Sequence, residues 1–343
     1  MKILGIECSC DDTSISIVDS SKTIIANEVL SQNNIHKKFD GIVPELAARN
    51  HVLFIDRILE KILIEKKLDM KHINLISATA GPGLIGGLLV GLSFAKTLAQ
   101  FNNIPFIGVN HLEGHALTTR LTNNTEFPFL LLLISGGHTS FYFVSDSNEY
   151  KFLGGTLDDA LGEAFDKVAK LLDLSFPGGP LLEELAKTGK SSLVDLPRPL
   201  IKKSTLNMSF SGLKTAVINK TKDKGYNNKF YSADIAASFQ EAVSDILCSK
   251  ITLAMKFCDD RLTPFRNVVV AGGVASNKYL RLKISEIVKK NRKNICFPPP
   301  NMCTDNGAMI AWAGYELYRK GIRSELNLRA RPRWPLEEVR NIK

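Results

Sequence analysis

Two histidines lie four residues apart in the segment His111-Leu112-Glu113-Gly114-His115. On a helix, residues four apart share one face, so both imidazole rings can offer a nitrogen to a single divalent ion. A third ligand must then come from another part of the chain. A pattern this short is about as frequent in histidine pairs that bind no metal as in pairs that bind one. The pair therefore predicts a metal site only together with other residues.

A zinc protease is the first class to compare, because its H-E-x-x-H helix also places two histidines four apart. In that motif, the glutamate beside the first histidine is the general base. Here the glutamate is Glu113, the third residue of the segment, which lies about 200° around the helix from His111. It points away from the face that the histidines share, so the spacing disfavours a protease.

The apolar residues 104–109 predict a strand that delivers Asn110 and His111 to its carboxyl end. In open α/β sheets, ligands bind at that edge. Three further strands are predicted at residues 75–79, 127–134 and 267–270, and each ends in a glycine-rich turn: residues 80–87, 135–138 and 271–277. Because backbone N–H groups in such turns bind anions, the three turns together indicate a phosphate-bearing ligand.

The chain also contains a faint internal repeat. Residues 13–18 and 139–144 both follow a strand and a tight polar or glycine turn, and both begin with Thr-Ser and alternate as a strand. Helices are predicted at residues 50–68, 84–99, 157–172 and 233–257. The repeat predicts two like-folded α/β lobes that face one another.

Three acidic residues remain to be placed. Asp11 and Asp12 lie in the turn between the first two predicted strands, residues 2–6 and 13–18, where ordinary turn chemistry is the simplest interpretation of each. Asp305 precedes a predicted helix, so it either caps that helix or supplies the third metal ligand. The residues 329–335 mix arginines with Trp334, and either contact nucleic acid or pack across the surface.

Composition bounds the remaining classes. The chain has 343 residues, 44% of them hydrophobic, which favours two globular domains. Its 44 Lys+Arg against 35 Asp+Glu leave a net charge of +9, which is compatible with a polyanionic partner. Six cysteines without a C-x-x-C pair indicate reduced thiols in a cytosolic protein. We expect no secretory signal, no membrane span and a cytoplasmic location.

Motifs along the whole chain resemble one family, that of the bacterial tRNA N6-adenosine threonylcarbamoyltransferases, once described as O-sialoglycoprotein endopeptidases. Each motif is common by itself, but together they are very specific. The motifs, besides the histidine pair, are Gly5-Ile6-Glu7, Gly41-Ile42-Val43-Pro44-Glu45-Leu46-Ala47, Ala80-Gly81-Pro82-Gly83, Ser135-Gly136-Gly137-His138-Thr139, Gly162-Glu163-Ala164-Phe165-Asp166-Lys167, Pro177-Gly178-Gly179-Pro180, Phe210-Ser211-Gly212-Leu213-Lys214, Ala271-Gly272-Gly273-Val274, Cys303-Thr304-Asp305-Asn306-Gly307-Ala308-Met309-Ile310-Ala311 and Arg331-Pro332-Arg333-Trp334.

The resemblance implies an α/β fold of the two-lobed actin-like ATPase superfamily (ASKHA), each lobe with a mixed sheet flanked by helices. Residues 1–125 with 301–325 would form lobe I, which carries the histidine pair. Residues 126–300 would form lobe II, with the glycine loops, and residues 326–343 a basic C-terminal extension.

The resemblance also implies the site residues. His111, His115 and Asp305 would bind one divalent ion, iron(II) or alternatively zinc. The family pattern assigns a set of positions to the threonylcarbamoyl-AMP substrate, and in this chain they are Leu133, Ile134, Ser135, Gly136, Gly137, Asp166, Gly179, Glu183 and Asn277. The chain departs from the pattern in three places, with Cys8 for threonine, Asp12 for glutamate, and Glu183 where aspartate is frequent.

The implied activity is acyl transfer. Threonylcarbamoyl would pass from threonylcarbamoyl-AMP to N6 of adenosine 37 in tRNAs that read codons beginning with A, with release of AMP. Asp11 is the candidate to orient or deprotonate the attacking amine, and the anticodon arm would bind basic residues: Lys202, Lys203, Lys214 and 329–333. The implied partners are a catalytically inert paralogue and an ATPase subunit.

Two other classes are compatible with parts of the sequence. Glycine loops alone would suit an ATPase or phosphotransferase of the same fold. Such enzymes hold magnesium with carboxylates and phosphates, however, and the pair His111 and His115 argues against them. A non-catalytic binding module should lack the pair altogether.

Overall fold

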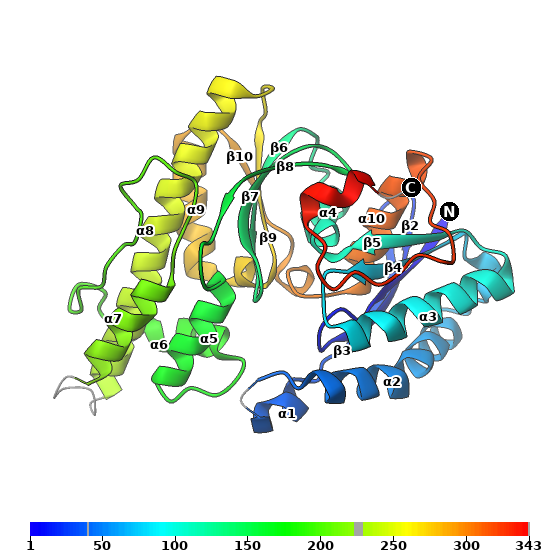
Figure 1. Cartoon of the computed structure of the whole chain (residues 1–343), viewed down its shortest axis with the longest axis horizontal. Helices are drawn as coiled ribbons and strands as arrows, with labels where there is room; N and C mark the ends of the chain where they lie inside the picture. Colours follow the sequence, from blue (N-terminus) through cyan, green and yellow to red (C-terminus); the bar gives the residue numbers. More distant parts are fainter. Residues whose placement is uncertain (40, 223–228, 342–343) are drawn as a thin grey trace. The chain divides into compact units, whose positions relative to one another are not determined.

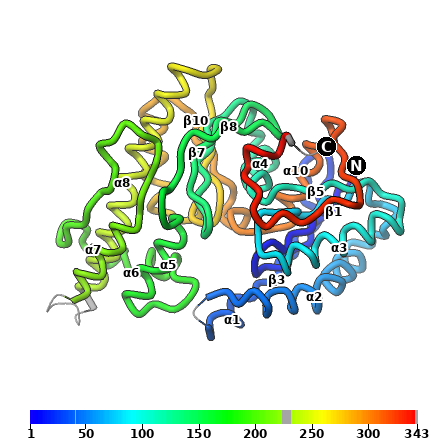
Figure 2. Tube along the Cα trace, viewed as in Figure 1, coloured from blue at the N-terminus to red at the C-terminus, as the bar shows by residue number. Residues whose placement is uncertain are grey.

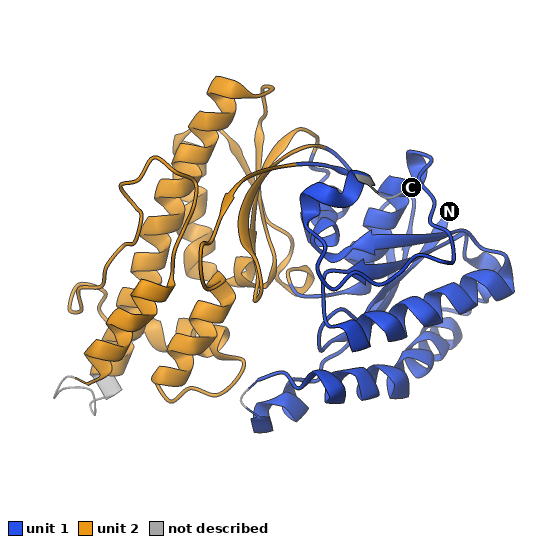
Figure 3. Ribbon diagram, in the orientation of Figure 1, with its two compact units in different colours: residues 1–125, 146–150, 304–343 blue, residues 126–145, 151–303 orange. Residues whose placement is uncertain are grey.

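The computed structural model describes residues 1–39, 41–222 and 229–341. The chain forms two compact units, shown in Figure 3: residues 1–125, 146–150 and 304–343 make unit 1, and residues 126–145 and 151–303 make unit 2. The residues from 326 onward, expected as an extension, group with unit 1. Residues 301–303 group with unit 2, and the turn at 146–150 groups with unit 1.

Unit 1 is built on a five-stranded sheet with the order β3-β2-β1-β4-β5 (Figure 1). Its strands are β1 (Lys2–Glu7), β2 (Thr13–Asp19), β3 (Ile24–Leu30), β4 (Leu75–Gly81) and β5 (Phe106–Asn110). β1 runs antiparallel to β2 and parallel to β4, which is parallel to β5. The carboxyl ends of β1, β4 and β5 therefore meet at one edge, as expected for a ligand-binding edge.

Helices cover both faces of this sheet. They are α1 (Asn33–His36), α2 (Pro44–Glu65), α3 (Ile85–Asn102), α4 (His111–Thr122) and α10 (Gly307–Arg319), with 3₁₀ turns at Lys37–Phe39, Met70–His72 and Leu336–Asn341. Gly5 of β1 faces α10, whereas the next residue, Ile6, faces Gly91 of α3. Because successive strand residues point to opposite faces, α10 and α3 lie on opposite sides of the sheet.

Unit 2 repeats this plan with the strand order β10-β9-β6-β7-β8. Its strands are β6 (Phe129–Ile134), β7 (Thr139–Asp146), β8 (Glu149–Gly155), β9 (Asn267–Ala271) and β10 (Asn294–Cys296). β6 is antiparallel to β7 and parallel to β9, as β1 is to β2 and β4. The two like-folded halves predicted from the faint repeat are therefore confirmed.

The core of unit 2 lies between its sheet and a layer of helices, whose course Figure 2 traces from green through yellow to orange. The helices are α5 (Leu161–Leu171), α6 (Gly178–Ala186), α7 (Ser211–Thr221), α8 (Lys229–Arg261) and α9 (Lys278–Lys290), with 3₁₀ turns at Gly273–Ser276 and Pro300–Met302. Phe165 of α5 and Phe239 of α8 meet edge to face at 5.1 Å between ring centroids. Such aromatic contacts fix how the helices pack.

The predicted elements are present, with shifted boundaries. α2 begins at Pro44 rather than at residue 50, because proline suits the first turn, where its missing N–H costs no hydrogen bond. α8 extends the helix predicted at residues 233–257 at both ends. Among the described residues, no helix is both long and apolar enough to cross a membrane.

Candidate metal centre and substrate loops

The histidine pair lies at the start of α4, where β5 ends. The side chain of Asn110 caps this helix by accepting a hydrogen bond from the N–H of Leu112 at 2.9 Å. An N-cap asparagine satisfies N–H groups that the helix itself leaves free. It lets the helix begin directly at the strand end, so His111 occupies the first helical position and His115 follows one turn later on the same face.

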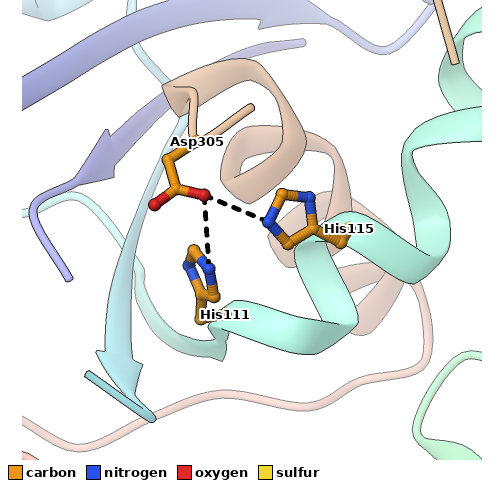
Figure 4. A group of neighbouring side chains, drawn as sticks. All are labelled: His111, His115 and Asp305. Atoms are coloured by element: carbon orange, nitrogen blue, oxygen red, sulfur yellow. Dashed lines mark hydrogen bonds and ion pairs between the residues drawn. The ribbon is translucent and has the colours of Figure 1, made fainter. Parts of the chain in front are cut away.

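Asp305 approaches this face from the segment before α10. The cap of α10 is Asn306, whose side chain accepts from the N–H of Met309 at 3.0 Å, so the interpretation of Asp305 as a helix cap is wrong. Instead, its Oδ1 lies 3.1 Å from Nε2 of His115 and 3.4 Å from Nε2 of His111, as Figure 4 shows. These distances agree with the other alternative, in which Asp305 is the third metal ligand beside the two histidines.

The donor set fits a divalent ion. One ligand atom from each of the three residues lies within 4.8 Å of the others. Ligands at about 2.0–2.2 Å from a shared ion are necessarily this close to one another. His115 is buried and the side chain of Asp305 is only 24% exposed, so water competes little for these groups. Two imidazoles and one carboxylate suit iron(II) as well as zinc and leave further coordination positions open.

Glu7 supports the cluster from the end of β1, and the sequence analysis did not identify it. Its Oε2 lies 3.0 Å from Nδ1 of His111 and accepts a hydrogen bond from Oγ1 of Thr79 at 2.5 Å. The N–H of Ser9 donates to the other carboxylate oxygen. A carboxylate on one ring nitrogen fixes the tautomer and aims the opposite nitrogen, here Nε2, at Asp305.

The carboxylates and imidazoles shift one another's titration. Burial alone would lower the pKa of His111, but the charges of Asp305 and Glu7 outweigh it and raise this pKa to about 9. Burial alone would raise the pKa of Asp305, but His111 and His115 lower it to about 2. The buried carboxylate of Glu7 and the half-buried carboxylate of Asp305 are thus stabilised by positive charge between them. A divalent ion provides that charge, as does a protonated imidazole.

Replacing Glu7 with glutamine is expected to weaken metal binding about 10- to 100-fold while the fold is retained, because loss of the charge on the outer partner makes His111 a poorer ligand. The metal content of the purified variant, titrated with a competing chelator, measures this. Glu60→Gln on the exposed face of α2 is the matched control. Equal affinities in the variant and the wild type would contradict the role given to Glu7.

Glu113, between the two histidines, points away from them as expected. It is buried, and its Oε1 accepts hydrogen bonds from the N–H of Asn148 at 2.9 Å and the hydroxyl of Tyr150 at 3.1 Å. It therefore ties α4 to the turn at residues 146–150. Burial is the main cause that raises the pKa of Glu113 to about 7, although both hydrogen bonds lower it.

This shift predicts a pH-dependent stability. The carboxyl of Glu113 titrates near 4.5 when exposed and near 7 when buried. The folded state therefore loses stability relative to the unfolded state between pH 4.5 and 7, by about 3 kcal/mol in total. Glu113→Gln should remove this loss, so its advantage in urea unfolding midpoint over the wild type should be larger at pH 8 than at pH 5. An advantage equal at both pH values would contradict the assignment.

Asp11 lies half-buried in the turn between β1 and β2. Two contacts hold this turn: His51 Nε2 lies 3.1 Å from the carbonyl of Cys10, and the N–H of Leu84 donates to the carbonyl of Ser9 at 2.7 Å. The neighbouring Asp12 is largely buried, and burial, followed by the charges of Asp11 and Asp305, raises its pKa to about 7. The turn therefore places a second carboxyl beside Asp11 in a fixed backbone.

The first glycine-rich turn has a packing role. A Cβ on Gly81 would lie 1.9 Å from the carbonyl oxygen of Arg331, and one on Gly83 would lie 2.4 Å from that of Ser9. These glycines let other backbone segments approach closely, and the space beside them is filled. Close packing of backbone segments, rather than anion binding, therefore explains the glycines at Gly81 and Gly83 in the turn at residues 80–87.

The other two glycine turns are open. No atom lies within 4 Å of a Cβ built on Gly136, Gly137 or Gly273. They follow β6 and β9, which are parallel neighbours, so both turns lie at the same edge of the sheet of unit 2. Leu133 and Ile134, by contrast, are buried within β6, so their side chains are core and only their backbone can face a ligand.

The remaining predicted substrate positions lie on the helices of unit 2, where the side chains of Asp166 and Glu183 contact the starts of neighbouring helices. Asp166 of α5 accepts hydrogen bonds from the N–H groups of Gly178 and Gly179 at 2.9 and 3.2 Å, and burial nevertheless raises its pKa. Glu183 accepts from the N–H of Lys278 at 2.7 Å, and Asn277 caps the same helix, α9. Each side chain thus organises a turn, and Glu183 also lines a hollow of about 410 Å³.

The arginine-rich segment near the C-terminus belongs to unit 1 and packs against the ends of β4 and β5. Trp334 is buried, and its carbonyl accepts a hydrogen bond from the side chain of Asn110 at 3.0 Å. The N–H of Arg331 donates to Ala80 at 2.7 Å. The segment thus follows the packing alternative for Trp334, while Arg329 and Arg333 remain exposed.

Comparison with known proteins assigns the chain to a family. The sequence model described as tRNA N6-adenosine threonylcarbamoyltransferase matches residues 23–312. The protein of that name from Rickettsia bellii (strain OSU 85-389) is 51% identical over 98% of this chain and 99% of its own. The one from Rickettsia rickettsii (strain Sheila Smith) is 48% identical over 99% of this chain and 100% of its own. The chain belongs to this family. The resemblance and the transferase class inferred from the sequence are confirmed.

Solved structures support the fold alone. HypF from T. kodakarensis superposes with a TM-score of 0.62 at 15% identity, over 93% of this chain and 48% of that one. Component A of the Acidaminococcus fermentans (R)-2-hydroxyglutaryl-CoA dehydratase gives 0.51 at 17% identity, over 94% of this chain and 100% of its own. Both agree with the predicted fold of two lobes, each with a mixed sheet flanked by helices, and that fold is confirmed.

Proposed function

We propose that this enzyme transfers threonylcarbamoyl from threonylcarbamoyl-AMP to N6 of adenosine 37 in tRNAs that read codons beginning with A. The observation that carries the proposal is the convergence of His111, His115 and Asp305 in a member of this transferase family. In the reaction, N6 attacks the carbamoyl carbon and a C–N bond forms. The bond from that carbon to the phosphate oxygen breaks, AMP leaves, and N6 loses a proton.

His111, His115 and Asp305 would hold one divalent ion, iron(II) or alternatively zinc. When bound, such an ion supplies Lewis acidity and stabilises developing negative charge. The protein's part is to keep the three ligands preorganised. Glu7 fixes the ring of His111 and Asn110 fixes the start of the helix that carries both imidazoles.

The open turns after β6 and β9 would bind the adenylate. Their backbone N–H groups suit a phosphate and a carbamoyl oxygen that gains charge in the transition state. Ser135, Gly136 and Gly137 form one turn, which follows the backbone of Leu133 and Ile134 at the end of β6. The positions that would complete the proposed pocket in unit 2 are Asp166, Gly179, Glu183 and Asn277. Asp11, held in its fixed turn, would orient the attacking amine or accept its proton.

An inert paralogue is the proposed partner for unit 1, with an ATPase subunit as a further partner of the assembly. The supporting feature is an apolar patch on α2 and α3, made of Val52, Leu53, Ile85 and Leu89, each at least half exposed. The helices touch at Ala48 and Gly86, one turn before Val52 and Leu89, respectively. Exposed apolar patches of this kind are typical of protein interfaces.

Leu89→Glu is expected to weaken binding of the paralogous partner about 30-fold or more, because it buries a charge in the centre of the patch. Titration calorimetry with the purified partner measures the change. Phe101→Glu is the matched control, since Phe101 is an exposed apolar residue at the opposite end of the same helix. An equal loss of affinity for the partner in both variants would show that the patch is not the interface.

The proposed activity is tested by nucleoside mass spectrometry of unmodified tRNA incubated with the protein, its partners and threonylcarbamoyl-AMP. The expected product is threonylcarbamoyladenosine, formed with stoichiometric AMP. Absence of the product with active partners would overturn the proposal, and turnover of ATP without tRNA would favour an ATPase instead. A cytoplasmic location accords with a tRNA substrate and forms part of the same proposal.

A further inference from the structure

A buried lysine organises a loop of unit 2 that the proposed chemistry does not use. Lys250 of α8 has no exposed surface. Its ammonium donates hydrogen bonds to the carbonyls of Leu200 at 2.7 Å, Lys203 at 3.0 Å and Thr205 at 2.7 Å. The hydroxyl of Ser249 donates to a fourth carbonyl, that of Ile201, at 3.3 Å. The loop therefore turns its carbonyl groups inward around a positive charge.

The backbone of this loop is held in a form that it would not adopt by itself. Leu200 has a φ of 57°, in the left-handed region that bulky side chains rarely occupy. Such a conformation persists where the surroundings determine it, and here Lys250 and Ser249 do so. Residues so fixed are often found where a protein presents groups to a ligand.

The outer surface of the loop is positively charged. Lys202 and Lys203 are exposed, and no carboxylate of the described residues lies within ion-pair distance of either. Arg198 differs, because it is paired with Asp245 at 3.0 Å. Together with Leu200 and Ile201, these three basic residues line a hollow of about 480 Å³.

The surface suits a polyanion. Because the carbonyls point inward, the negative ends of their peptide dipoles are removed from the surface. The ammonium groups of Lys202 and Lys203 remain on that surface, and the buried ammonium group of Lys250 lies beneath it. The exposed Ser204 and Thr205 add hydroxyl donors, which frequently contact phosphate oxygens. Lys167 of unit 2, by contrast, is paired with Asp159 and Glu163, both at 2.8 Å.

We propose that residues 198–205 form a docking surface for the phosphate backbone of the tRNA substrate, with Lys202 and Lys203 as its cationic contacts. The inference rests on the proposed function, which supplies an RNA as the polyanion. Contacts of this type position an RNA without reading its sequence, and they weaken as salt rises because bound counterions are released.

The test measures the binding of unmodified tRNA to the wild-type protein with its partners at several salt concentrations, by fluorescence anisotropy. The double variant Lys202→Ala/Lys203→Ala should bind about tenfold more weakly at low salt. The slope of its log affinity against log salt should be shallower by about 1.5, since each lost phosphate contact removes roughly 0.7–0.9. Lys289→Ala/Lys290→Ala, an exposed pair at the end of α9, is the matched control and should leave both quantities unchanged.

The outcomes separate this inference from the proposed function. A wild type that forms the modified nucleoside, with a double variant that keeps its affinity and slope, would overturn the docking surface only. A wild type that neither binds tRNA nor modifies it would overturn the proposed function. Vesicles with phosphatidylserine address the other source of phosphates: vesicle binding lost in the double variant, with tRNA binding intact, would assign the loop to a membrane and refute the RNA contact.

Discussion

Replacement of His115 by alanine is expected to abolish stoichiometric metal binding and to lower the rate of threonylcarbamoyl transfer about 100-fold or more. His115 is buried, and its Nε2 lies 3.1 Å from Oδ1 of Asp305. Without it, two protein ligands remain, which is too few to hold a divalent ion tightly. Loss of Lewis acid stabilisation worth several kcal/mol corresponds to a rate loss of two or more orders of magnitude.

Two measurements decide this prediction. Elemental analysis gives the metal content per subunit, and nucleoside mass spectrometry gives the rate. His72→Ala serves as the control, because His72 is an exposed histidine outside the cluster. If His115→Ala kept a full complement of metal, the cluster would not be the binding site. If it lost the metal but kept its rate, the ion would be structural and the chemistry would belong to the loops of unit 2.

Local sequence patterns predict the two histidines of this cluster but not its carboxylates. The apolar run before Asn110 predicts a strand, and the spacing of His111 and His115 predicts a shared helix face, because both depend on neighbouring residues only. Asp305 is different, since 190 residues separate it from His115. Its position depends on the packing of α10 against the sheet, and the spacing of residues does not contain that packing.

Glu7 illustrates a second limit. It ends β1 just as Asn110 ends β5, and the strand order puts both at one edge of the sheet. The strand itself was predicted, but its neighbours were not, so the contact between Glu7 and His111 had no signal in a single sequence. A strand that ends in a buried carboxylate beside a predicted ligand edge is the pattern that would have identified it.

The glycine turns show why similar sequences receive different roles. All three follow a strand, and the sequence treats them alike as anion sites. In the structure, Gly81 and Gly83 accommodate the backbone of distant segments, whereas Gly136, Gly137 and Gly273 face open space. Only tertiary packing distinguishes a glycine needed for close approach from one that leaves room for a ligand.

Gly5→Ala is expected to destabilise unit 1 by about 3 kcal/mol and to reduce its metal content, although Gly5 touches no ligand of the cluster. A Cβ at this position would lie 2.0 Å from the carbonyl oxygen of Gly307 and 2.6 Å from the backbone N of Ala311. Both atoms belong to the backbone of α10, which cannot move aside as a side chain can. Overpacking of this kind costs about 1–3 kcal/mol, and more where the backbone is rigid.

The consequence for the metal follows from the chain order. Only the cap residue Asn306 separates Asp305 from α10, so a shift of the helix away from β1 carries the carboxylate away from His111 and His115. The urea concentration at the midpoint of unfolding and the metal content should therefore both be lower in Gly5→Ala than in the wild type. Gly41→Ala should change neither, because nothing lies within 4 Å of the added Cβ. A destabilised Gly5→Ala protein with full metal content would mean that Asp305 is positioned independently of the packing of α10 on β1.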